Sequence, residues 1–207
     1  MEFNLLPDRD SLQRTIEAVR SRGINVFLLE TKEPALAQIQ SMIPAAATVM
    51  TGHSITLEQI GFVPFLMSKQ NPWRNFKDEI LAEKDPIKQL ALRKQGTLAD
   101  YFLGSVHAIA ETGEIVIASA TGSQLPAYCY SSTHVIWVAG AQKITPTLET
   151  AFRRVREYSL PLEDQRMKQV TGTEVATVIG KLLVFEKEVP YLHRSVNLVL
   201  INEVLGF

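Results

Sequence analysis

The residues 51–61 form the segment of this sequence whose residue types best suit a binding site. A short apolar run, residues 47–50, indicates the end of a buried strand, and Leu57 and Ile60 then fall three apart as on a helix face. A strand that turns through glycine and serine into a helix directs several backbone N–H groups at one point, where they and the helix dipole favour an anion. We therefore expect an anion-accepting pocket here. Its predicted lining is Gly52, His53, Ser54 and Thr56.

The same turn also has a purely structural interpretation. Ser54 could cap the helix, or Thr56 could do so in a capping box with Gln59. His53 could donate to a carboxylate or act as a general acid, but it could equally be an exposed turn residue. Both interpretations stay open on the sequence alone.

A second group of small polar residues surrounds a predicted β-hairpin. Its strands are residues 106–110 and 115–118, and Gly113 suits the tight turn because glycine accepts positive φ. Glu111 in this turn is the carboxylate that we expect to act as base or nucleophile, unless it is simply solvated. The flexible loop 119–124 after the second strand suits a ligand. The residues predicted to reach the first pocket are Glu111, Thr112, Gly113, Gly122 and Ser123.

The segment 134–139 is the clearest buried strand, and Gln142 and Lys143 follow its end. The ends of parallel strands are where α/β sheets commonly form ligand crevices. Gln142 and Lys143 are therefore added to the predicted ligand-binding residues, although a lysine at a strand end is often only solvated.

The remaining pattern alternates helices with strands and predicts an α/β fold with a mostly parallel sheet flanked by helices. The hairpin is expected to be an antiparallel addition to that sheet, and residues 1–207 to form one domain. Thr31, and Thr145 with Pro146, are expected to begin helices, and Pro190 to join two late strands as a hairpin. The predicted elements are a helix at 11–22, a strand at 24–29, a strand at 47–50, and late strands at 182–185 and 196–201.

The composition excludes several classes of protein. The chain has 207 residues, 46% of them hydrophobic, and a net charge of −1, which gives nucleic-acid binding little electrostatic support. Its one cysteine, Cys129, excludes a disulfide framework and a cysteine-ligated iron–sulfur cluster within this chain. The four histidines lack metal-ligand spacing, and no dinucleotide or P-loop motif occurs, so we expect no metal and no cofactor. The absence of a signal peptide and of a long apolar run predicts a cytoplasmic protein with no membrane span.

Several segments together resemble the LUD domain family, the lactate utilisation protein C group that is also called DUF162. Their order and spacing make the resemblance fairly specific. The segments that carry it are residues 48–61, 110–116, 134–144 and 199–207.

The resemblance implies a fold similar to the NagB/RpiA/CoA-transferase group, with a Rossmann-like sheet and helices on both faces. It also implies a part in oxidising lactate to pyruvate beside partner subunits that carry iron–sulfur clusters, with a small carboxylate or phosphate as ligand. The chain departs from many relatives in two respects. It has His53 where many have glycine, and no cysteine from Ser159 onward, where many longer relatives carry a cysteine-rich segment.

Three functions stay open on the sequence. The chain could be a substrate-binding subunit of a lactate-oxidising system, or a stand-alone enzyme of the CoA-transferase or sugar-phosphate isomerase kind that uses Glu111. It could also be a carboxylate-sensing regulator without catalytic activity. The lack of clustered cysteines favours the first or third function over independent redox chemistry. A homo-oligomer is compatible with all three.

Overall fold

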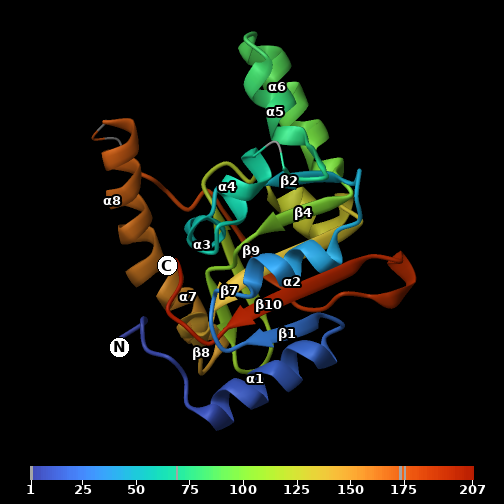
Figure 1. The fold of residues 1–207 in the computed structure, drawn as a ribbon. Coiled ribbons are helices and arrows are strands. Elements are labelled where there is room, and N and C mark those ends of the chain that lie inside the picture. The colour runs from blue at the N-terminus through green and yellow to red at the C-terminus, as the bar shows by residue number, and fades with distance from the viewer. Residues whose placement is uncertain (1, 69, 173, 175) are drawn as a thin grey trace.

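A six-stranded parallel sheet forms the centre of the computed structural model, which describes residues 2–68, 70–172, 174 and 176–207 (Figure 1). Every neighbouring pair in this sheet runs parallel. The α/β architecture with a mostly parallel sheet is therefore confirmed. In spatial order the strands are β1 (Asn25–Leu29), β10 (Ser195–Ile201), β7 (His134–Gly140), β4 (Tyr101–Gly104), β2 (Thr48–Thr51) and β3 (Arg74–Asn75).

Helices cover both faces of this sheet, because side chains of the central strands alternate between the two faces. In β7, Val135 and Trp137 pack in a cluster with α1 residues such as Ile16, whereas Ile136 and Val138 pack in a separate cluster with α2, α3 and α4. The helices are α1 (Arg9–Ser21), α2 (Ala35–Met42), α3 (Ile55–Gln59), α4 (Phe62–Met67), α5 (Phe76–Ala82), α6 (Pro86–Gln95), α7 (Leu148–Arg154) and α8 (Leu160–Thr171).

A second sheet of four strands contains the predicted hairpin. Its strands lie in the order β8 (Ile144–Thr145), β5 (Ala108–Ala110), β6 (Ile115–Ser119) and β9 (Lys181–Phe185). The antiparallel β5–β6 pair is confirmed, but it belongs to this second sheet and is not an addition to the parallel one. Helix α7 packs on it through Ala151, which lies in a cluster with Ala108 and Val116.

Three local predictions were wrong, and in the first two a strand pairing decided the local structure. The late strands do not form a hairpin through Pro190, since β9 pairs with β6 while β10 lies between β1 and β7. Thr145 belongs to β8 and pairs with Ala110 of β5. Helix α7 therefore begins only at Leu148, and its N-cap is Thr147, whose hydroxyl accepts from the backbone N–H of Thr150. Helix α2 follows Pro34 without any side-chain cap, so Thr31 does not begin it.

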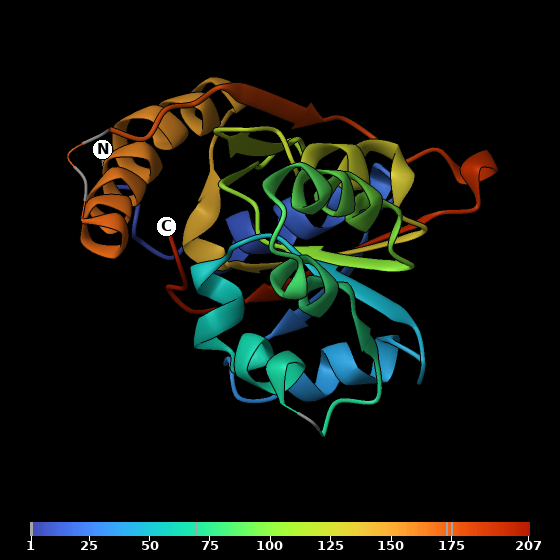
Figure 2. The same cartoon turned by 90° about the horizontal axis from the view of Figure 1, so that it is seen from above.

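The ends of the described chain come together on one side of the molecule, near α7 and α8 (Figures 1 and 2). Seen from above, α7 and α8 form an arm beside the sheets, and the chain then turns back along this arm to β9 (Figure 2). In the described part of the chain, no helix has the length and apolar character needed to cross a membrane.

Candidate functional site

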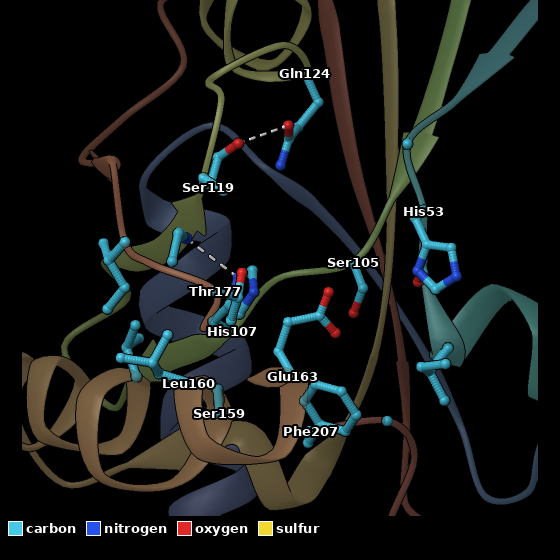
Figure 3. A pocket seen from close by; sticks show the side chains of 18 of the residues that line it. His53, Ser105, His107, Ser119, Gln124, Ser159, Leu160, Glu163, Thr177 and Phe207 are labelled. Atoms are coloured by element: carbon cyan, nitrogen blue, oxygen red, sulfur yellow. Dashed lines mark hydrogen bonds between the residues drawn. The ribbon is translucent and has the colours of Figure 1, made fainter. Parts of the chain in front are cut away.

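A cavity of about 560 Å³ lies where the carboxyl ends of the central strands face α8. Parallel strands all end at the same edge of a sheet, so the segments that follow them meet there. Gly52 to Thr56 follow β2, Ser105 to His107 follow β4, and Lys143 closes the short turn after β7. The second sheet contributes Ala118 and Ser119 at the end of β6, and α8 contributes Glu163 and Arg166. Figure 3 shows Ser105, Glu163 and His53 facing a common space, with Phe207 beside them.

The turn 52–56 has the local structure that its sequence predicts. Ser54 is extended and its hydroxyl accepts from the backbone N–H of Leu57 at 3.2 Å, which confirms the Ser54 N-cap. Within the described residues, no backbone acceptor is recorded for the N–H groups of His53 and Ile55. The turn therefore keeps hydrogen-bond donors at the cavity wall.

Lys143 is the most unusual residue of the cavity. Its side chain is buried, with 1% of its surface exposed, and its Nζ donates to Ser105 Oγ and Val106 O at 3.0 Å and to Thr56 Oγ1 at 3.3 Å. In the described part of the chain no carboxylate forms an ion pair with it. Burial, with a smaller contribution from the charge of Arg154, lowers the pKa of Lys143 to about 7.

A second buried cation, Arg154, lies just behind the cavity wall. Its Nη1 donates to the carbonyl of His107 and to Ser159 Oγ, and its guanidinium carbon lies 5.0 Å from the centre of the Tyr158 ring. Its Nε and Nη2 have no hydrogen-bond partner among the described residues. Burial lowers the pKa of Arg154 to about 10, far enough above neutral pH that the group stays charged.

His107, whose carbonyl accepts from Arg154, has a neutral imidazole. Its Nδ1 accepts from the backbone N–H of Ala118 at 3.2 Å (Figure 3). Burial first, and then the charges of Lys143 and Arg154, lower the pKa of His107 to about 3. The interior end of the cavity therefore has a neutral imidazole close to two basic groups, Lys143 in the wall and Arg154 behind it.

The other end of the cavity is more exposed and its charges are paired. Arg166 donates to both carboxylate oxygens of Glu163, at 2.6 and 2.7 Å. His53 Nε2 lies 3.3 Å from a Glu58 oxygen and 3.4 Å from Arg166 Nη1, and burial together with Arg166 lowers the pKa of His53. Among the side chains of the described lining residues, Lys143, Arg166 and Arg93 are basic and Glu163 alone is acidic, so basic groups are in excess.

Two π-helical turns border the cavity. The turn η2 (Ala127–Ser131) supplies Tyr128, and η4 (Val155–Ser159) supplies Val155 and Ser159. A π-turn contains one residue more per turn than an α-turn, and such turns are frequent at functional sites. The Tyr128 hydroxyl lies over Gly104 so closely that a Cβ there would be 1.8 Å from it.

The segment 205–207 completes the wall above Lys143. Gln142 Nε2 donates to the carbonyl of Leu205 at 2.8 Å, and the backbone N–H of Gly206 donates to Gln59 Oε1 at 2.7 Å. Gly206 lies so close to α3 that a Cβ there would be 2.4 Å from Thr56 Oγ1. Gln142 thus holds the wall in place and does not line the cavity.

The structure brings only some of the predicted site residues together. Those that line the cavity are Gly52, His53, Ser54, Thr56, Ser123 and Lys143. Those that do not are Glu111, Thr112, Gly113, Gly122 and Gln142.

The hairpin turn lies outside the cavity because the cavity contacts the other end of the same two strands. Glu111 accepts from Ser11 Oγ at 2.6 Å and from Arg14 Nη2 at 3.1 Å, so α1 holds it. A Cβ on Gly113 would meet the Ala18 backbone at 2.8 Å, and a Cβ on Gly122 would lie 3.0 Å from Lys181. The expectation that the hairpin turn shares one pocket with residues 52–56 was therefore wrong.

Several polar residues of the site were missed on the sequence, among them Ser105, His107, Glu163 and Arg166, together with Arg154 behind the wall. Arg154 carried a usable signal, because it lies between Ala151 and Val155, whose spacing is that of one apolar helix face. Ser105 directly precedes the predicted strand 106–110 and His107 lies within it, where the expected role is structural. Among the described residues, no cluster of three or more His, Cys, Asp or Glu side chains could hold a metal ion.

Comparison with known proteins gives a family and a fold. The family model of the LUD domain matches residues 12–179 of this chain. The crystal structure of a DUF162 family protein from Deinococcus radiodurans is similar, with a TM-score of 0.55 over 95% of this chain and 98% of that chain. The sequences are 13% identical, so this likeness concerns the fold alone. No match was found among curated proteins.

Proposed function

Because the chain belongs to the LUD domain family, we propose that it is a lactate-utilisation component whose cavity binds a small organic carboxylate beside Lys143. The observation that carries the proposal is the buried ammonium group of Lys143, which lines the cavity without a carboxylate partner in the described chain.

Electrostatics gives the physical reason. An unpaired charge taken out of water costs several kcal/mol, which is why buried charges are normally paired. The lowered pKa of Lys143 expresses this cost, and Arg154 adds a second positive charge nearby. A bound anion would offset the cost of both cations. The hydroxyls of Thr56 and Ser105 accept from Lys143 Nζ and can donate their own protons to the bound anion.

The role of a binding subunit suits this chain better than that of a stand-alone enzyme based on Glu111. Glu111 is held by Ser11 and Arg14 and does not line the cavity. Oxidising lactate also requires a group that accepts electrons. With Cys129 as its one cysteine, this chain would depend on a partner subunit for a cysteine-ligated cluster.

Isothermal titration calorimetry with L-lactate and with pyruvate tests the proposal. At least one acid should bind at pH 7, and Lys143→Met should weaken its binding by about 30-fold or more, because losing one partner of a buried charge pair costs about 2–5 kcal/mol. Lys88→Met removes an exposed lysine of α6 and is the matched control, which should bind like the natural chain. Binding that is unchanged in Lys143→Met, or absent for both acids in the natural chain, would contradict the proposal.

A further inference from the structure

Beyond charge, Lys143 offers a nucleophile, and we propose that its Nζ forms a reversible imine with the carbonyl carbon of a 2-oxo acid bound in the cavity. This inference rests on the proposed function and narrows its ligand to an acid with a carbonyl next to its carboxylate. A 2-hydroxy acid of the same size has no carbonyl and cannot form the adduct.

The position of Lys143 supports the reaction. Among the described residues that line the cavity it is the only lysine, so no other side-chain amine there competes for a carbonyl. A salt bridge would lock Nζ as an ammonium ion, but the groups in contact with it are two hydroxyls and a carbonyl. Burial also favours the neutral amine, which is the nucleophilic form, and the pKa of about 7 leaves much of Lys143 neutral at pH 7.

The neighbouring hydroxyls give the protons a route. The Nζ lone pair forms a bond to the carbonyl carbon, and the carbonyl oxygen becomes a hydroxyl by taking a proton from the amine through Ser105 or Thr56. Loss of this hydroxyl with the second amine proton releases one water molecule and leaves the C=N bond. No oxidant or reductant is needed. Ser105 Oγ and Thr56 Oγ1 lie 3.3 Å apart, and both contact Nζ, so they form one connected path.

The imine is compatible with the excess positive charge of the site. Once protonated, it restores the cation of Lys143 directly beside the carboxylate of the same ligand. The paired charges then lie beside Gly206, which lines the cavity next to Lys143.

Reductive trapping tests this inference. The natural chain is incubated at pH 7 with pyruvate and cyanoborohydride, digested, and mapped by mass spectrometry. A carboxyethyl group should appear on Lys143 at least about tenfold faster than on any other lysine, because exposed lysines near pKa 10.4 are almost fully protonated at pH 7. L-Lactate should give no adduct, and the unfolded chain should lose the selectivity. Lys143→Arg keeps the cation, so it should still bind pyruvate in calorimetry while the selective adduct disappears.

The outcomes separate this inference from the proposed function. If pyruvate binds to the natural chain in calorimetry and Lys143 stays unmodified, the imine is overturned while the binding function stands. If neither pyruvate nor lactate binds and no selective adduct forms, both are overturned. Selective modification of Lys143 in the natural chain supports the imine even if Lys143→Arg fails to fold.

Discussion

The two ends of the β5–β6 hairpin differ in how they balance charge. At the turn, each carboxylate has an arginine partner, with Glu111 paired to Arg14 and Glu114 to Arg22. At the other end, Lys143 and Arg154 are buried without a carboxylate partner in the described chain. The carboxylates at the turn are neutralised within the chain, whereas the buried cations at the other end are the basis on which we propose a carboxylate ligand.

The same contrast separates stabilising charges from charges that cost stability. Pairs near the surface, such as that of Glu111 with Arg14, contribute about 0–1 kcal/mol. A buried and unpaired cation is unfavourable by several kcal/mol. Residues at the two ends of the hairpin should therefore respond differently to substitution and to pH.

The largest effect is expected from Lys143→Met. The pKa of Lys143 falls from 10.5 in the unfolded chain to about 7 in the folded one, so the unfolded state binds more protons between these values. The contribution of Lys143 to the free energy of unfolding therefore becomes more favourable by about 3–4 kcal/mol as pH rises from 7 to 10. Methionine has no such dependence. Urea unfolding of both proteins at pH 7 and pH 10 should show this difference, and parallel pH profiles would refute the unpaired-cation description.

A somewhat smaller effect is expected from His107→Asn in acid. The folded pKa of about 3 lies below the ordinary 6.5, so the unfolded state binds more protons between these values and stability falls as pH is lowered. The natural chain should lose about 2–3 kcal/mol more than the variant between pH 6 and pH 4. Asparagine can still accept from Ala118. The control is His193→Asn, at an exposed position with a left-handed backbone that asparagine tolerates. This variant should lose as much stability in acid as the natural chain. If His107→Asn and His193→Asn lose equal stability between pH 6 and pH 4, His107 is excluded as the cause of the acid sensitivity.

Gly140→Ala tests whether the wall above Lys143 depends on close packing. A Cβ at Gly140 would lie 2.1 Å from Gln142 Oε1 and 2.5 Å from the carbonyl of Glu203. We expect a loss of about 1–3 kcal/mol in thermal unfolding from overpacking. Faster hydrogen exchange in residues 203–207 should accompany it. Gly61→Ala is the control: its Cβ would meet no other atoms, so the strain is confined to its own left-handed backbone, and exchange in 203–207 should stay unchanged.

The smallest effect is expected from Glu111→Gln. Glutamine can still accept from Ser11, and only the partly exposed pair with Arg14 is lost, so stability should change by no more than about 1 kcal/mol. Carboxylate binding should not change. A loss of binding or turnover in this variant would reverse the comparison and return Glu111 to the site.

The sequence predicted the fold better than it predicted the site. Apolar runs and helix periodicity are local patterns, so the strands and helices could be predicted from them. The alternation of helices with strands then predicted the parallel arrangement. The turn 52–56 was also predictable, since strand, glycine and Ser54 cap are contiguous. The residues that contact a hairpin turn are distant in the sequence. Glu111 was therefore assigned to the cavity, although Ser11 and Arg14 of α1 bind its carboxylate.

Lys143 is a second case in which distant residues decide the role of a side chain. Its position after a parallel strand was visible, but its burial was not, because burial depends on residues 205–207 closing over it. A lysine at a strand end is usually solvated, and only the tertiary structure shows that this one is enclosed.

The π-helical turn Val155–Ser159 bears on how relatives of this chain should be aligned. A π-turn arises when one residue is inserted into a helix without lengthening it, and the residues beyond it rotate about the helix axis. A relative with one residue fewer between Arg154 and Pro161 would keep the helix yet present different side chains to the cavity. Counting residues across this turn would therefore sort family members by the side chains that they present to the cavity, even where overall sequence identity is too low to do so.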